Sequence, residues 1–192
     1  MKDYVKMIIF ILILGLVTSV LLGGMDALTK DRIAENQEAE LKATLLRAYD
    51  IDYTFTNIHN VYDNSVEEVE NNDFTFYVDK TTGKISYVFE GNGVWGPIIG
   101  VITLESDFET ISSITILQQE ETPGLGAVVA ERQYLENFVG KKMTPEIVIT
   151  KNPTNPENEV RAISGATRTS NAFANILNTN YATAKEAWDT RG

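Results

Sequence analysis

Residues 74–118 read FTFYVDKTTGKISYVFEGNGVWGPIIGVITLESDFETISSITILQ. Four runs in this stretch are rich in β-branched and aromatic residues, and they cover 74–78, 85–90, 98–105 and 111–118. Such residues favour β-strands, and glycine-containing turns separate the runs. Because strands that follow one another in sequence usually pair as neighbours, the stretch predicts at least four strands in a mainly antiparallel sheet.

Two segments after the predicted sheet have the spacing of helices. Residues 127–139 (AVVAERQYLENFV) carry apolar residues at helical intervals and end before Gly140, a common helix stop. A short strand at 146–150 and a loop rich in proline and asparagine at 151–159 follow. The last predicted helix has one apolar stripe, formed by Phe173, Ile176, Leu177, Tyr181, Ala184 and Trp188. Together these elements predict an α+β domain with helices flanking the sheet.

An apolar segment lies near the N-terminus. Residues 7–25 read MIIFILILGLVTSVLLGGM, which is 19 residues without a charged side chain. At about 1.5 Å per residue, a helix of this length spans roughly 30 Å of hydrocarbon. The run is longer than the apolar core of a typical signal peptide, and no A-x-A cleavage site follows it. We therefore predict a single transmembrane helix that is retained.

Charge predicts the orientation of this anchor. Lys2 and Lys6 precede the apolar run, and the next charged residue is Asp26. The positive-inside rule then places the N-terminus in the cytoplasm and the C-terminal domain outside it, in a single-pass protein of the cell membrane. Removing Lys2, Lys6 and Asp3 from the 16 basic and 27 acidic residues leaves a formal charge of -12 for the remainder. Such an acidic surface repels phosphate backbones, so no nucleic-acid partner is expected.

The sequence between the anchor and the sheet is polar. Residues 26–50 lack Gly and Pro and mix apolar with charged residues, which predicts an amphipathic helix that extends the anchor. An irregular connection is predicted after it, with a polar stretch that includes Glu67, Glu68, Glu70, Asn71 and Asn72. We predict three parts: a cytoplasmic tip and transmembrane helix at 1–25, a juxtamembrane helix and connection at 26–72, and one domain at 73–192.

Two residue counts exclude several chemistries. The chain has no Cys, which excludes disulfides, thiolate metal sites and a thiol nucleophile. Its one histidine, His59, would need ligands from elsewhere to form a zinc site, so a structural histidine is favoured and no metal is expected. A serine hydrolase is disfavoured because Ala162 stands where a G-x-S-x-G elbow around Ser164 needs glycine.

Hydroxyl residues gather where the last predicted helix begins. The segment ISGATRTSNAF at 163–173 carries Ser164, Thr167, Thr169 and Ser170. The unpaired N–H groups of a helix start donate hydrogen bonds either to the side chain of a Ser or Thr N-cap or to an anionic phosphate. Composition alone favours plain capping, because such clusters are common at helix starts.

The string SGATRTS at 164–170 resembles the flavinylation motif of the FMN-binding domain family. This family includes the G subunit of the Rnf electron transport complex and the C subunit of the sodium-translocating NADH:quinone reductase. ETPGLGA at 121–127 and GVWGPIIG at 93–100 are similar to two further family segments. Each string alone is a weak signal, but all three occur in the family's order behind one anchor. The resemblance covers about residues 1–190 and implies a single FMN-binding domain.

The resemblance implies covalent attachment of FMN to Thr167 by an FAD-using flavin transferase. Gly165 and Ala166 would leave room for the transferase, and the helix start would stabilise the phosphodiester charge. The motif often begins with an acidic residue where this chain has Arg161, which is predicted to approach the phosphate instead. The other predicted residues of the motif are Ser164, Gly165, Ala166 and Thr169.

A flavin ring needs an apolar wall and a few hydrogen bonds that tune its electronics. Predicted contacts to the ring are Trp95, Glu121, Thr122, Gly124, Leu125, Gly126 and Lys141. The glycines would let the backbone approach, Leu125 would pack on the ring face, and Glu121, Thr122 and Trp95 would contact its edge. Lys141 would stabilise the reduced ring or the phosphate, with an ordinary surface lysine as the alternative.

The resemblance implies an electron-carrying subunit of a membrane-bound ferredoxin:NAD oxidoreductase that translocates ions. No independent catalysis is expected, and the implied partners are the other membrane subunits of an Rnf complex and the flavin transferase. A component like the C subunit of the sodium-translocating NADH:quinone reductase is the first alternative; the short chain and the GVWGPIIG segment favour the G subunit of Rnf. The other alternative is a non-redox, membrane-anchored surface module in which SGATRTS only caps a helix.

Overall fold

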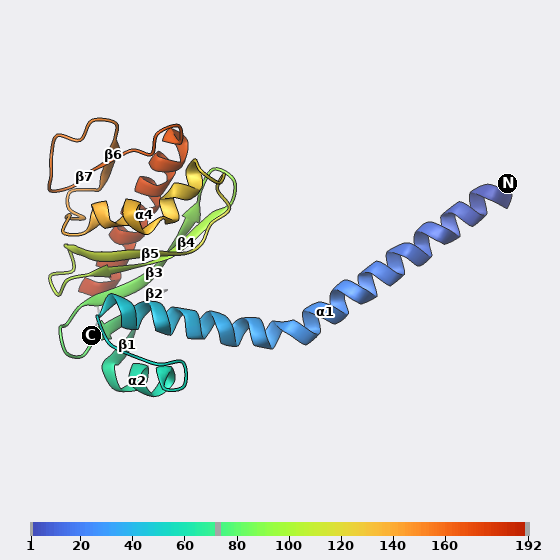
Figure 1. Ribbon diagram of the computed structural model, residues 1–192, viewed down its shortest axis with the longest axis horizontal. Coiled ribbons are helices and arrows are strands. Elements are labelled where there is room, and N and C mark those ends of the chain that lie inside the picture. Colours follow the sequence, from blue (N-terminus) through green and yellow to red (C-terminus); the bar gives the residue numbers. More distant parts are fainter. Residues whose placement is uncertain (1, 72–73, 191–192) are drawn as a thin grey trace. The chain divides into compact units, whose positions relative to one another are not determined.

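The computed structural model describes residues 2–71 and 74–190 (Figure 1). Contacts between residues divide the chain into two compact units, Met1–Leu41 and Lys42–Gly192. The first unit is one helix, the N-terminal part of α1 (Lys2–Ala48). None of its apolar stretch is buried, and among the described residues α1 is the one helix long and apolar enough to cross a membrane. This agrees with the predicted anchor, and α1 also includes the helix predicted after residue 26.

The second unit is built around a five-stranded sheet. Its strands are β1 (Val66–Asn71), β2 (Phe74–Asp79), β3 (Ile85–Asn92), β4 (Pro97–Leu104) and β5 (Ile111–Gln118). They pair in sequence order, and every pair is antiparallel. The predicted α+β class and the antiparallel pairing are therefore confirmed. A small parallel pair, β6 (Val148–Thr150) and β7 (Glu159–Arg161), stands apart from this sheet.

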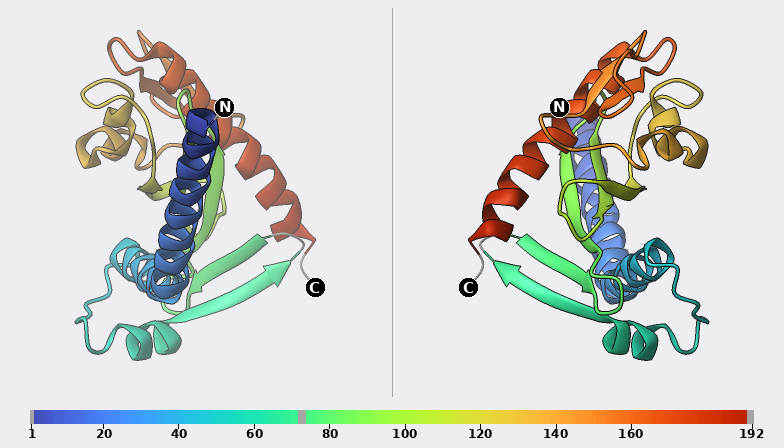
Figure 2. Two further views of the ribbon diagram at one scale, coloured as in Figure 1. Left: turned by 90° about the vertical axis from the view of Figure 1, so that its right-hand side faces the viewer. Right: turned by 90° about the vertical axis from the view of Figure 1, so that its left-hand side faces the viewer.

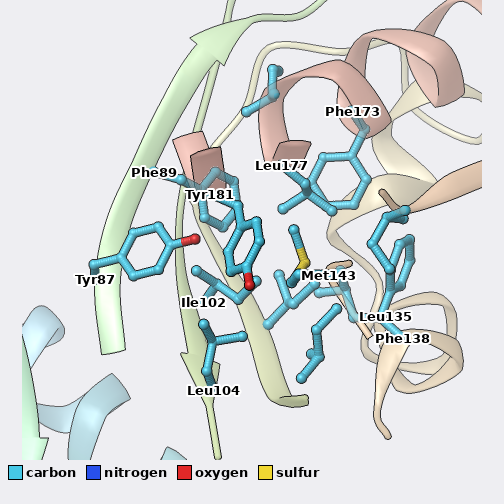
Figure 3. Close-up of a cluster of buried hydrophobic side chains, with 14 of the residues drawn as sticks. Tyr87, Phe89, Ile102, Leu104, Leu135, Phe138, Met143, Phe173, Leu177 and Tyr181 are labelled. Carbon is cyan, nitrogen blue, oxygen red and sulfur yellow. The ribbon is translucent and has the colours of Figure 1, made fainter. Parts of the chain in front are cut away.

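Helix α4 (Thr167–Asp189) covers one face of the sheet. Figure 2 shows it running alongside the strands, and Figure 3 shows Phe173, Leu177 and Tyr181 of α4 facing the apolar side chains of the sheet. Five of the six residues of the predicted stripe are buried, and the sixth, Trp188, packs partly buried against the same core. The ring of Trp188 stacks on Phe108 with centroids 5.1 Å apart. The predicted stripe is confirmed as core packing.

The last turn of α1 covers the opposite face. Successive side chains of a strand point to opposite faces, so Ser86 points away from the face on which Tyr87 meets the core. Tyr49, just after α1, donates from its hydroxyl to the Tyr77 carbonyl at 2.6 Å and lies 2.8 Å from the Ser86 hydroxyl. Ser86 in turn lies 2.8 Å from the Thr103 hydroxyl. This buried polar chain ties the end of α1 to the sheet.

The predicted irregular connection before the sheet is wrong. Helix α2 (Ile58–Ser65) and strand β1 occupy it; Asn72 lies outside the described residues. β1 is an edge strand, so its glutamates stay in water while Val66 is buried. Charged residues on an edge strand also oppose pairing with another chain, and for this reason the stretch lacks an ordinary strand pattern.

The predicted helix at 127–139 is also wrong in detail. Three short elements replace it: η1 (Gly126–Ala130), α3 (Arg132–Leu135) and η2 (Glu136–Phe138). The extended backbone of Glu131, with φ -74° and ψ 131°, interrupts the helix. The break lets Val129, Leu135 and Phe138 all enter the core, which one straight helix would not allow. Strand β7 was not predicted, because its sequence EVR falls at the end of a polar loop.

Candidate functional site

The three family-like segments meet at one end of the sheet, where the side chain of Glu121 joins them. Its Oε1 accepts hydrogen bonds from the backbone amides of Val94 (2.7 Å) and Trp95 (3.1 Å) in the turn between β3 and β4. Its Oε2 accepts a hydrogen bond from the Thr169 hydroxyl at 2.6 Å. Glu121 is only 4% exposed and Thr169 is equally buried. The structure thus joins Glu121 to two other predicted residues, Trp95 and Thr169, which lie 26 and 48 positions from it.

The hydrogen bonds around Glu121 favour its ionised form. Burial alone would raise the pKa of this carboxyl, because the charged form loses water. The Thr169 hydroxyl and the amides of Trp95 and Val94 outweigh that effect and hold the pKa of Glu121 below its ordinary value. The site therefore contains a buried carboxylate held by dipoles.

Two glycines make room for this carboxylate. A Cβ at Gly126 would lie 2.6 Å from Glu121 Oε2 and 2.8 Å from Thr169 Oγ1. A Cβ at Gly93 would lie 2.5 Å from Glu121 Oε1. We predicted that Gly126 admits a flavin ring; in the structure its missing side chain is needed for the contact between Glu121 and Thr169. Gly93 was not among the predicted residues, although it belongs to the GVWGPIIG string.

The start of α4 has no side-chain cap. Its N-cap residue is Ala166, and no side chain bonds the first turn. The Ser170 hydroxyl donates to the Ala166 carbonyl and accepts from the Ile163 amide, both at 3.0 Å, and Thr169 is bonded to Glu121. The Ser or Thr N-cap that composition favoured is therefore not formed at this helix. Among the described residues, nothing bonds the backbone amides of the first three residues of α4.

Two hydroxyls of the motif remain accessible. Ser170 and Thr169 are buried, whereas Ser164 and Thr167 are exposed. Thr167 is the first residue of α4, so its hydroxyl lies beside the unbonded amides. Gly165, two residues earlier, has a φ of +79°, a conformation that residues with a side chain rarely adopt. Of the four hydroxyls of the motif, that of Thr167 is both exposed and placed at the start of α4.

Apolar side chains are exposed around the same cluster. Trp95 is 71% exposed and Leu125 is 44% exposed, although Glu121 fixes the backbone of Trp95. A Cβ at Gly165 would lie 3.0 Å from Leu125 Cδ2, which places Leu125 against the SGAT segment. The loop is closed by the Thr122 carbonyl, which accepts hydrogen bonds from the amides of Leu125 and Ala127, both at 3.1 Å. Gly124 has a φ of +72° and open space around it.

The structure does not bring Lys141 to this cluster. Its ammonium donates to the Pro156 carbonyl at 2.7 Å, and its own carbonyl accepts from the Ile111 amide at 2.8 Å. Ile111 begins β5, whereas the Glu121 loop follows the other end of β5. At about 3.3 Å per residue, the two ends of this strand are roughly 25 Å apart. Arg161, at the end of β7, is exposed, and so is Arg168 in the first turn of α4, which we had not predicted.

Other possible sites do not involve these residues. A groove of about 600 Å³ lies between the end of α1, β5 and α3, and it is lined by residues such as Arg47, Ile114 and Leu135. None of the predicted site residues lines it. Within residues 2–71 and 74–190, no group of three or more His, Asp or Glu side chains is placed to hold a metal ion.

The chain is similar in sequence to one protein family and to subunits of two membrane complexes. Residues 93–182 match the FMN-binding domain family. The G subunit of the ion-translocating oxidoreductase complex of Methanosarcina acetivorans is 29% identical over 96% of this chain and 97% of that protein. The C subunit of the Na(+)-translocating NADH-quinone reductase of Vibrio anguillarum is 39% identical over 105 residues, which are 50% of this chain and 41% of that protein. The chain thus spans about two fifths of the length of this Vibrio protein.

Solved structures share the fold. NqrC of Shewanella oneidensis superposes with a TM-score of 0.65 and 18% identity, over 74% of this chain and 90% of that one. The C subunit of the Na(+)-translocating NADH-quinone reductase of Parabacteroides distasonis gives a TM-score of 0.69 and 22% identity, over 85% and 98% of the two chains. At these identities the likeness concerns the fold alone.

Proposed function

We propose that this chain, which carries an FMN-binding domain and is a relative of the G subunit of ion-translocating oxidoreductases, holds FMN as a phosphodiester on Thr167. One observation supports this residue above all others. Thr167 presents an exposed hydroxyl at the first position of a 23-residue helix whose first amides have no partner among the described residues. The neighbouring hydroxyls of Thr169 and Ser170 are buried and already bonded.

The residues at the start of α4 suit the FMN phosphodiester that the family resemblance implies. The attachment forms a bond from Thr167 Oγ1 to the FMN phosphorus of FAD and breaks the pyrophosphate bond, so that AMP leaves and the hydroxyl proton is released. The phosphodiester keeps one negative charge, which the positive end of the α4 dipole and its free N–H groups stabilise. Arg161 and Arg168 add positive charge close to Thr167 in sequence.

FMN supplies one- and two-electron chemistry when bound, and this chain contributes position and environment. Trp95 and Leu125 offer exposed apolar surface beside the SGAT segment. The positive φ at Gly124 leaves the backbone of the 121–127 loop open to close approach. We propose that these residues cover the ring. Thr122 and Gly126 would keep the 121–127 loop in shape without touching the ring.

The electron carrier that we propose works inside a membrane complex. The match over nearly the full length of the Methanosarcina protein favours a component of an ion-translocating ferredoxin:NAD oxidoreductase of the Rnf type. The higher identity to the C subunit of the sodium-translocating NADH-quinone reductase, over a shorter segment, keeps that complex as the second candidate. Native purification and identification of the co-purifying subunits separates the two.

Mass spectrometry tests the attachment site directly. Trypsin cuts after Arg161 and Arg168, which releases residues 162–168 (AISGATR) without Thr169 or Ser170. For the full chain produced with a flavin transferase, we expect the added FMN mass on this peptide. The mass should disappear in Thr167→Val and persist in the matched variant Ser164→Ala. An unmodified peptide from native membranes would instead favour the non-redox surface module.

A further inference from the structure

The carboxylate of Glu121 is buried and already hydrogen-bonded within the chain. Both carboxylate oxygens are engaged by the chain itself: one by the amides of Val94 and Trp95, the other by the hydroxyl of Thr169. The residue is 4% exposed, so its neighbours shield it from a flavin held at the surface. The expected direct contact from Glu121 to the ring does not suit this geometry.

The bonds of Glu121 hold the surfaces that we assign to the flavin. These surfaces belong to three segments: the turn that carries Trp95, the loop that carries Leu125 and the first turn of α4. Glu121, in the loop, is hydrogen-bonded to both of the other segments. The Gln119 side chain adds a further bond at 2.6 Å to the Glu121 amide. Without the carboxylate, no other side-chain hydrogen bond joins the 93–96 turn to the start of α4 among the described residues.

The charge of this carboxylate is not neutralised. Within the described part of the chain, no Lys or Arg forms an ion pair with Glu121; its partners are two N–H groups and one O–H group. Dipoles stabilise a charge without cancelling it, and a buried charge is screened less than one in water. A negative charge at this place opposes the addition of electrons to a nearby ring.

We infer that Glu121 is a positioning residue that holds the flavin-binding surfaces in place before attachment, and that its buried negative charge lowers the reduction potential of the bound flavin. The inference rests on the proposed function, because it needs a flavin on Thr167. In this inference Glu121 acts by holding Trp95 and Thr169 in place, and it does not contact the ring.

The substitution Glu121→Gln separates shape from charge. A glutamine can accept from the Val94 and Trp95 amides and donate to the Thr169 oxygen, so the arrangement survives while the charge is lost. The matched control is Glu120→Gln, which removes the charge of the adjacent carboxylate, an exposed one that water screens. In the loaded full chain, we expect a higher midpoint potential for Glu121→Gln than for the natural protein. The potential of Glu120→Gln should stay that of the natural protein.

The substitution Glu121→Ala tests positioning without any flavin. In the full chain produced without transferase, the 93–96 turn should become mobile, so the anisotropy of tryptophan emission should fall. Trp188, the other tryptophan, packs against the core and should not change. Unchanged anisotropy together with lost flavin loading would overturn the inference, because Glu121 would then act by direct contact with flavin or transferase.

The outcomes distinguish the inference from the proposed function. Natural protein without FMN on residues 162–168 would overturn the proposed function, whatever the variants do. Loaded Glu121→Gln with the potential of the natural protein would overturn the assigned charge effect while leaving the attachment to Thr167 intact. A raised potential in Glu121→Gln alone, with lower anisotropy in unloaded Glu121→Ala, supports the inference.

Discussion

The hydroxyl of Thr169 donates to Glu121 Oε2 across 2.6 Å, and this bond joins the loop after β5 to the first turn of α4. Both residues are 4% exposed. A hydrogen bond to a buried charged acceptor contributes more to stability than one between neutral groups. The relative placement of the three family-like segments therefore depends on two side chains that lie 48 residues apart.

Removal of the Thr169 hydroxyl should destabilise the fold. Thr169→Val keeps the shape but leaves Glu121 with an unmet acceptor, so we expect a loss of about 1–3 kcal/mol in the free energy of unfolding. Urea unfolding of the full chain in detergent, followed by circular dichroism, measures it. Thr169→Ser retains the hydroxyl and should stay close to the natural protein. A Thr169→Val midpoint equal to that of the natural protein would show that the bond contributes nothing.

Gly126→Ala should act through the same bond. Its Cβ would lie 2.6 Å from Glu121 Oε2 and 2.8 Å from Thr169 Oγ1, and such overpacking typically costs about 1–3 kcal/mol. Thr169→Ala removes one of the two clashing atoms and frees the other to move. The cost of Gly126→Ala should therefore be smaller in a Thr169→Ala background, with a coupling of about 0.5–3 kcal/mol in a double-mutant cycle.

A distant partner provides the control for this cycle. Thr183 is exposed on α4, and 14 residues at about 1.5 Å each place it roughly 20 Å from Thr169. Gly126→Ala and Thr183→Ala should be additive. Equal coupling energies in the two cycles would mean that Gly126 does not act through the bond between Glu121 and Thr169.

Acid should weaken the fold partly through Glu121. The pKa of its carboxyl is below the ordinary value in the folded chain, where hydrogen bonds from Thr169, Trp95 and Val94 outweigh burial. Stability from such a group is fully present above its unfolded pKa of about 4.3 and is lost as the pH falls through the lower folded pKa. Urea midpoints from about pH 6 to pH 3 should fall more for the natural protein than for Glu121→Gln. Parallel curves would contradict this assignment.

The end of α1 should depend on the Tyr49 hydroxyl. This group bonds the Tyr77 carbonyl at 2.6 Å and lies 2.8 Å from the Ser86 hydroxyl, on the face of the sheet opposite α4. Tyr49→Phe leaves these buried groups short of a partner, so we expect a loss of about 1–3 kcal/mol in urea unfolding. Tyr53→Phe is the matched control, because no hydrogen bond of the Tyr53 hydroxyl occurs within the described residues. Similar losses in the two variants would argue against this tie.

The regular parts of the fold were predictable because their side chains follow the period of the element. Strands β2 to β5 carry β-branched and aromatic residues, and α4 places its apolar residues on one stripe. β1 was not predicted because only Val66 of this edge strand is fully buried, so its sequence lacks the alternation of apolar and polar residues that indicates a strand. The segment after Gly126 escaped prediction because the break at Glu131 serves packing against the core, which local spacing does not express.

The candidate site was predictable in its parts, and its connections were not. Motif strings identified Thr167, Glu121 and Trp95, but a string does not say that a carboxylate bonds two amides 26 and 27 positions away. Lys141 shows the opposite error. Its charge suggested a role beside the ring, whereas the pairing at the start of β5 takes it to the other end of the strand.

Orientation in the membrane is the last prediction. We expect the N-terminus on the cytoplasmic side and the domain on the other, because Lys2 and Lys6 precede the apolar segment and the rest of the chain is acidic. The chain has no Cys, so one introduced cysteine reports its own location. In right-side-out vesicles, a membrane-impermeant maleimide should label Glu157→Cys, whose natural residue is exposed in the domain, and should not label Lys2→Cys. Inside-out vesicles should give the reverse pattern. Labelling of Lys2→Cys in right-side-out vesicles would place the C-terminal domain in the cytoplasm and refute this orientation.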